Sequence, residues 1–130
     1  INGVSKKIKI FGKAEFESLK NNLIGINLEK TLFLVDIEGS EFDIFDKEFC
    51  NYFSKSFFII EDHNFNVLNK SKKNKFYKNL KKYFKIEIIK DISKNPFKFE
   101  LLKSYTDDEK YLMMSEGRPE SMQWLILYPN

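Results

Sequence analysis

The sequence predicts an α/β fold built on a mostly parallel sheet. Segments with the apolar spacing of helices alternate along the chain with short apolar runs typical of strands. Two of these runs, Thr31 to Ile37 and Ser56 to Ile60, are almost continuously apolar, as in parallel strands that are buried on both faces. Strands that alternate with helices join through right-handed crossovers into a parallel sheet, so the alternation implies this fold class.

Composition indicates a folded domain or part of one. The chain has 130 residues, 42% apolar and 16% aromatic, which is enough to bury a core. No apolar run approaches the roughly 20 residues that span a bilayer, so we expect no membrane contact. Cys50 is the single cysteine and cannot form an internal disulfide, which favours a reducing, cytoplasmic compartment. Ile1 opens the sequence in place of methionine, so we expect a processed chain or a fragment of a longer one, with residues 1–130 forming a single partial domain.

The first half of the chain predicts two strands and two helices in alternation. The run Lys7 to Gly12 suits a short strand, and Ala14 to Leu23 suits a helix that closes near Gly25. The strand Thr31 to Ile37 follows, and Ser40 is a candidate N-cap for the next helix. Aromatic residues at helical spacing form the apolar stripe of that helix, namely Phe42, Phe45, Phe49, Tyr52 and Phe53.

The second half continues the alternation. After the strand Ser56 to Ile60, Asn69 or Ser71 is a candidate cap for a helix with an aromatic stripe opposite its lysines. The run Lys85 to Ile92 alternates more strictly and predicts a strand nearer an edge. Two weaker helices and a closing strand are expected over Phe97 to Tyr105, Asp107 to Met114 and Met122 to Tyr128.

Acidic residues and the only histidine follow the two apolar strands. Asp36 and Glu38 come at the end of the first strand, and Glu61 and His63 at the end of the second. Because ligands in open α/β sheets bind beyond the carboxyl ends of the strands, we expect these four side chains to share one site. A general base there could take a proton from a hydroxyl or amine nucleophile.

Simpler roles for the same residues stay open. Asp36 could bond the amides of its own turn, and Glu41 could lie in a first helical turn and favour the helix dipole. His63 could be a polar group satisfied within the fold. Carboxylates and a histidine could also hold a divalent ion, but no recognised metal spacing occurs, so we expect no metal site.

Two basic features have alternatives of the same kind. The lysines of the predicted third helix could bind phosphate groups, but its aromatic residues form one separate stripe, which favours a solvated outer face over a nucleic-acid partner. The sole arginine, Arg118, lies in the loop Glu116 to Trp124, where it forms a surface ion pair or clamps a substrate carboxylate or phosphate with its guanidinium. Glu116 is the second candidate substrate-binding residue of this loop. The lysines are Lys72, Lys73, Lys75, Lys78, Lys81 and Lys82.

Three stretches carry a resemblance to a known family. LVDIEGSEFDIF, FFIIEDH and EGRPESMQWLILYP together resemble the carboxyl-terminal half of FkbM-like, S-adenosylmethionine-dependent methyltransferases. The resemblance implies a Rossmann-like, three-layer sandwich whose sheet lacks the first two strands of the full fold. On this mapping Lys7 to Gly12 is the third family strand, Thr31 to Ile37 the fourth and Ser56 to Ile60 the fifth. The last two strands form a closing antiparallel pair.

The same resemblance implies an activity. It is transfer of a methyl group from S-adenosylmethionine to a hydroxyl, or to an amine, of a small molecule or glycan. The family's glycine-rich cofactor turn has no counterpart here, so cofactor binding needs a segment upstream of Ile1 and the chain alone is expected to be inactive. The implied cofactor contacts are Gly12, Ala14 and Asp36, and the implied acceptor-binding or basic groups are Asp36, Glu38, Glu61 and His63.

Two alternatives to an enzyme remain from the residues alone. One is a non-catalytic α/β binding module that takes an anionic ligand or nucleic acid through the lysine helix. The other is a complete small domain that dimerises through an exposed sheet edge. The sequence leaves the oligomeric state and the identity of the acceptor open.

Overall fold

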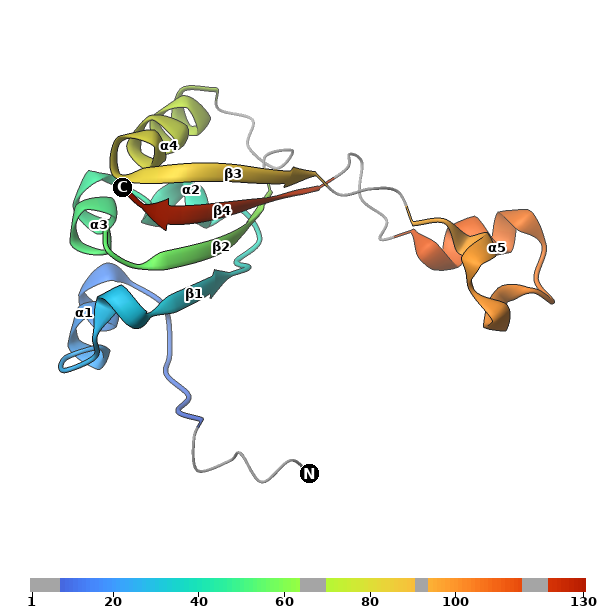
Figure 1. Ribbon diagram of the computed structural model, residues 1–130, viewed down its shortest axis with the longest axis horizontal. Coiled ribbons are helices and arrows are strands. Elements are labelled where there is room, and N and C mark those ends of the chain that lie inside the picture. Colours follow the sequence, from blue (N-terminus) through green and yellow to red (C-terminus); the bar gives the residue numbers. More distant parts are fainter. Residues whose placement is uncertain (1–7, 64–69, 91–93, 116–121) are drawn as a thin grey trace.

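A four-stranded sheet forms the centre of the fold. The computed structural model describes residues 8–63, 70–90, 94–115 and 122–130. Its strands form one sheet in the order β1-β2-β4-β3. β1 and β2 are parallel, and β4 is antiparallel to both of its neighbours, so β1, β2 and β3 run in one direction with β4 reversed between the last two (Figure 1). The strands are β1 (Leu32–Val35), β2 (Phe57–Asp62), β3 (Phe84–Lys90) and β4 (Gln123–Pro129).

The predicted α/β class and the closing antiparallel pair of β3 and β4 are confirmed. The predicted strand over Lys7 to Gly12 is wrong in its described part, because residues 8–12 are irregular. Ile8 and Ile10 are 59% and 92% exposed, and β1 pairs only with β2, so this segment has no neighbouring strand. An alternating pattern forms a stable strand only where a partner strand is present.

The described helices are α1 (Phe16–Asn22), α2 (Glu41–Ile44), α3 (Lys47–Tyr52), α4 (Lys70–Tyr83) and α5 (Asp107–Met114). Short 3-10 turns cover Leu28–Lys30, Pro96–Lys98 and Glu100–Leu102.

The aromatic stripe that predicts one helix after Ser40 belongs to two helices. The break falls at Phe45, which has non-helical backbone angles, and Asp46 then starts α3 by accepting a hydrogen bond from the Phe49 amide at 2.8 Å. Ser40 precedes α2, but its side chain makes no capping hydrogen bond. Asp46, and not the predicted Ser40, is therefore the residue whose side chain caps a helix here. An aspartate before a helix satisfies a backbone amide that would otherwise lack a partner.

The structure also answers two questions about the ends of the predicted helices. Gly25, just beyond α1, has a φ of 81°, the left-handed conformation that glycine adopts at little cost. Ser71 lies inside α4 and is not its cap, while Asn69 lies outside the described residues.

The core lies on one face of the sheet. Phe58, Ile60, Leu125 and Leu127 are fully buried and face α2, α3 and α4. The helices contribute mainly phenylalanine rings, which pack edge to face and tilted; the Phe45 and Phe49 centroids lie 4.7 Å apart. The helical side chains of the core are Phe42, Phe45, Phe49, Cys50, Phe53, Phe76 and Leu80.

The opposite face of the sheet is open among the described residues. Leu32 and Leu34 of β1 are 61% and 70% exposed, and Phe57 and Ile89 are also exposed. The prediction that the strand over Thr31 to Ile37 is buried on both faces is therefore wrong, because β1 is an edge strand with helices on one side only. The described residues form two layers, so the third layer of the predicted sandwich is not found among them.

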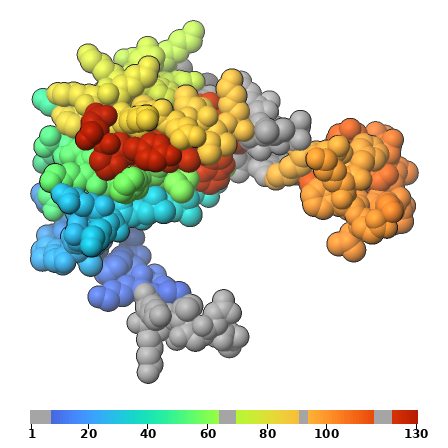
Figure 2. All heavy atoms as spheres, in the orientation of Figure 1, coloured from blue at the N-terminus to red at the C-terminus, as the bar shows by residue number. Residues whose placement is uncertain are grey.

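Residues 94–115 form a small lobe of their own to the side of the sheet (Figure 2). Thr106 and Glu109 start α5 with a reciprocal capping box, and the ring centroids of Phe97 and Tyr111 lie 5.8 Å apart.

Within the part of the chain that the structure describes, no helix is long and apolar enough to cross a membrane.

Candidate functional site

The turn after β1 carries the first half of the candidate site. Asp36 and Glu38 follow the strand directly, and their side chains are 52% and 78% exposed. Glu38 has a φ of 52°, and Gly39 has a φ of 94°. A left-handed glutamate is uncommon and costs about 1 kcal/mol or more, so the fold holds this turn at some expense in stability.

Glu41 fixes this turn to the end of β2. Its carboxylate is fully buried, and its Oε2 accepts a hydrogen bond of 2.9 Å from the Gly39 amide. Its Oε1 accepts one of 3.0 Å from the amide of His63 and lies 3.2 Å from His63 Nδ1. A buried carboxylate is stable only when such donors surround it, and here they join two segments that are separate in the sequence.

His63 is the centre of the cluster, with a side chain that is 1% exposed. A carboxylate oxygen accepts hydrogen bonds, so the contact with Glu41 Oε1 favours the tautomer with the proton on Nδ1. The other nitrogen, Nε2, lies 3.4 Å from Glu38 Oε2, 3.7 Å from Asp36 Oδ1 and 4.0 Å from Glu61 Oε2. Four carboxyl groups therefore surround one imidazole at the carboxyl ends of β1 and β2.

The structure brings Asp36, Glu38, Glu61 and His63 together, as the sequence predicts from the ends of two neighbouring strands. Whether they act on a substrate stays a prediction.

The other predicted site residues that the structure describes, Gly12 and Ala14, are not among the side chains of this cluster. Gly12 and Ala14 lie in the exposed irregular segment before α1, and a side chain at Gly12 would meet no atom within 4 Å. Glu116 and Arg118 lie outside the described residues. The described residues therefore provide the acidic edge, whereas the implied cofactor contact at Gly12 faces open space.

The role of Glu41 is the main feature that the sequence did not reveal. It is the last acidic residue of the run DIEGSE, and its position at the start of a helix suggested only a favourable interaction with the helix dipole. The available signal was its combination with the glycine two residues before it, since a tight turn can direct a following side chain back onto its own amides.

A second buried polar group lies beside the site. The Asp62 side chain, fully buried, accepts hydrogen bonds from the hydroxyl of Tyr77 in α4 and from Nε2 of Gln123 in β4. Burial, and then the hydrogen bond to Asp62, raise the pKa of the Tyr77 hydroxyl. This group ties α4 to two strands next to His63, so its role is to hold the ends of these elements together.

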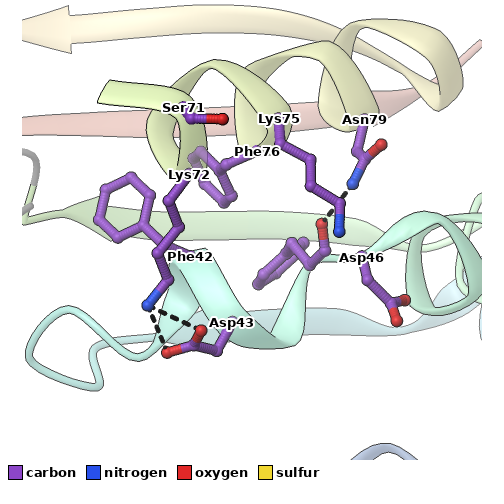
Figure 3. A pocket seen from close by; sticks show the side chains of 9 residues that line it. Phe42, Asp43, Asp46, Ser71, Lys72, Lys75, Phe76 and Asn79 are labelled. Carbon is purple, nitrogen blue, oxygen red and sulfur yellow. Dashed lines mark hydrogen bonds and ion pairs between the residues drawn. The ribbon is translucent and has the colours of Figure 1, made fainter. Parts of the chain in front are cut away.

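The lysine helix contributes to a different hollow, between α2 and α4 (Figure 3). Its volume is about 340 Å³. Lys72 forms an ion pair with Asp43 at 2.7 Å, and Asn79 donates a hydrogen bond of 3.1 Å to the Phe45 carbonyl. Lys75 and Asp46 also line this hollow, so it carries both signs of charge and is not a purely basic surface. The absence of a nucleic-acid partner stays a prediction.

Comparison of the chain with protein-family models, with curated proteins and with solved structures gives no match.

Proposed function

We propose that this chain is the acceptor-binding part of a methyltransferase that uses S-adenosylmethionine and methylates a hydroxyl, or an amine, of a small molecule or glycan. One observation carries the proposal. A buried histidine, oriented by a buried glutamate, turns its second nitrogen toward carboxylates at the ends of two adjacent parallel strands. The resemblance to FkbM-like enzymes in the same two segments supports it.

The residues fit the acceptor side of such a reaction. In the tautomer that directs its Nδ1 proton at Glu41, Nε2 of His63 is the basic nitrogen that accepts the proton of a bound hydroxyl. Asp36 and Glu38 are exposed and can accept hydrogen bonds from further hydroxyls of a sugar-like acceptor. The chain then contributes two effects, positioning of the nucleophile and removal of its proton.

The residues do not fit the cofactor side. S-Adenosylmethionine would supply the methyl group, but Gly12 and Ala14 lie in an exposed segment and form no enclosed pocket. We therefore assign no contact with the methyl donor to these two residues and derive no step through it. Cofactor binding belongs, in this proposal, to a part of the protein outside residues 1–130.

Methyl transfer to hydroxylated small molecules and glycans, measured with isotopically labelled cofactor and the full-length protein, tests the proposal. We expect His63→Ala to reduce turnover by about 10² to 10⁴, the usual contribution of a positioned base. Glu41→Gln should lower kcat more than it raises KM, because Glu41 orients His63 without touching the acceptor.

Asp108→Asn is the control, since it removes one exposed carboxylate from α5, in the separate lobe. Near-UV circular dichroism checks that each variant is folded. Unchanged turnover in folded His63→Ala would contradict the proposal. Two results together would favour the binding module. The wild type would transfer no methyl group, and replacement of Lys75 and Lys78 would abolish its binding of an anionic ligand or nucleic acid.

A further inference from the structure

We infer that Asp36, Glu38 and His63 form a binding site for a divalent transition-metal ion of the Zn²⁺ or Mn²⁺ type. One nitrogen and two carboxylate oxygens of these residues all lie within 4.8 Å of one another. The ligands come from two segments that are separate in the sequence, which explains why no metal spacing is visible there.

The distances match a shared ion better than direct hydrogen bonds. Nε2 of His63 lies 3.4 Å from Glu38 Oε2 and 3.7 Å from Asp36 Oδ1. Hydrogen bonds of this kind usually measure about 2.7 to 3.2 Å. Two ligands about 2.1 Å from a tetrahedral zinc ion are, by contrast, about 3.4 Å apart. Small rotations of the two exposed carboxylates would therefore complete the coordination.

Glu41 provides the outer contact that a metal-binding histidine needs. Metal-ligating histidines usually donate their other N–H to a carboxylate or carbonyl, which fixes the tautomer and the orientation of the ring. The Glu41 carboxylate lies 3.2 Å from Nδ1 and is itself held by the Gly39 and His63 amides. The ring is thus oriented before any ion arrives, with Nε2 toward the two carboxylates.

The ligand set also indicates the class of ion. Imidazole nitrogen is a good ligand for zinc and its first-row neighbours, whereas Mg²⁺ and Ca²⁺ prefer sites made of oxygen alone. Three protein ligands leave at least one coordination position open, as in catalytic zinc sites. Because Asp36 and Glu38 are exposed, that position is accessible to a water molecule or to an oxygen of another molecule.

An ion on Nε2 would change how an acceptor is activated. It would make a coordinated hydroxyl more acidic, and the proton would pass to a neighbouring carboxylate such as Glu61 in place of His63. This consequence rests on the proposed methyl transfer. The binding of the ion does not, so the two can fail separately.

Competition with a chromophoric chelator, carried out on the full-length protein with Zn²⁺ alone and then Mn²⁺ alone, measures the affinity directly. We expect the double variant Asp36→Asn, Glu38→Gln to bind Zn²⁺ at least about 100-fold more weakly than the wild type. Glu41→Gln should weaken binding by about 10- to 100-fold, the usual effect of an outer contact. Asp108→Asn, which removes a carboxylate far from the site, should leave the affinity unchanged.

Substitution with Co²⁺ gives a second readout, because its visible absorption depends on the number and geometry of the ligands. We expect His63→Gln to alter or abolish that absorption. Equal Zn²⁺ affinity in the wild type and the double variant would overturn the inference, as would failure of the wild type to bind either ion. Both substituted carboxylates are exposed, so loss of the fold is not expected to obscure the result.

Discussion

The two faces of the sheet carry similar side chains in opposite surroundings. Leu125 is fully buried beneath the helices, whereas Leu34 on the other face is 70% exposed. Both are leucines in strands of the same sheet. The difference shows that an apolar residue in a strand does not establish its own burial, because burial depends on which elements cover that face.

The comparison also explains how stability is distributed. On the covered face, Phe58, Ile60, Leu125 and Leu127 belong to one buried cluster with side chains of α2, α3 and α4, so removal of such a side chain leaves a cavity. On the open face, the same substitution removes a side chain that already contacts water. The same chemical change should therefore have very different effects on the free energy of unfolding.

The largest effect is expected on the covered face. Leu125→Ala should lower the free energy of unfolding by about 2 to 5 kcal/mol, because it opens a cavity in the centre of the core. Urea unfolding of the full-length protein, followed by far-UV circular dichroism, measures this change. A loss below about 1 kcal/mol would mean that the helices do not cover β4 as described.

An intermediate effect is expected where the covered face becomes polar. Tyr77→Phe removes one hydrogen-bond donor from the buried carboxylate of Asp62 and should cost about 1 to 3 kcal/mol. The effect should also depend on pH. Burial raises the pKa of Tyr77 in the folded state, so its contribution is complete below the unfolded pKa of about 10 and is lost as the pH rises above it.

Unfolding of wild type and Tyr77→Phe at neutral and alkaline pH checks this dependence. The difference in stability between them should narrow above about pH 10, because only the wild type releases this proton on unfolding. A difference that stays constant to higher pH would indicate that the hydroxyl of Tyr77 is not held by Asp62.

The smallest effect is expected on the open face. Leu34→Ala should change the free energy of unfolding by about 0.5 kcal/mol or less, as at other exposed positions. The substitution matches Leu125→Ala in the atoms removed, so the pair isolates the role of burial. A loss as large as that of Leu125→Ala would show that this face is covered in solution.

Most of the fold could be predicted because its signals are local. The aromatic stripe of α4 and the apolar run of β2 show their periods within single segments, and the structure places both as expected. The strand predicted over Lys7 to Gly12 was wrong in its described part for the opposite reason. A strand needs a neighbouring strand to pair with, and no local sequence pattern shows whether one is present. The open face of β1 was missed because coverage by helices is a property of the assembled layers.

The candidate site divides in the same way. Asp36 and His63 could be placed at one edge because both follow parallel strands, and this geometry is set by the fold class. Glu41 could not be placed, because its contacts depend on how the turn at Gly39 bends back toward the end of β2. Distances between side chains of separate segments are likewise invisible in the sequence, and the inferred metal site depends on them.

The burial of Cys50 gives the molecule a built-in reporter of its own opening. This thiol, the single one in the sequence, is fully buried, and burial raises its pKa to about 12. Thiol reagents attack the thiolate, so the folded protein should react slowly with them. Each modification of Cys50 therefore requires that α3 first separates from its neighbours. The labelling rate thus measures how often the aromatic core unfolds transiently.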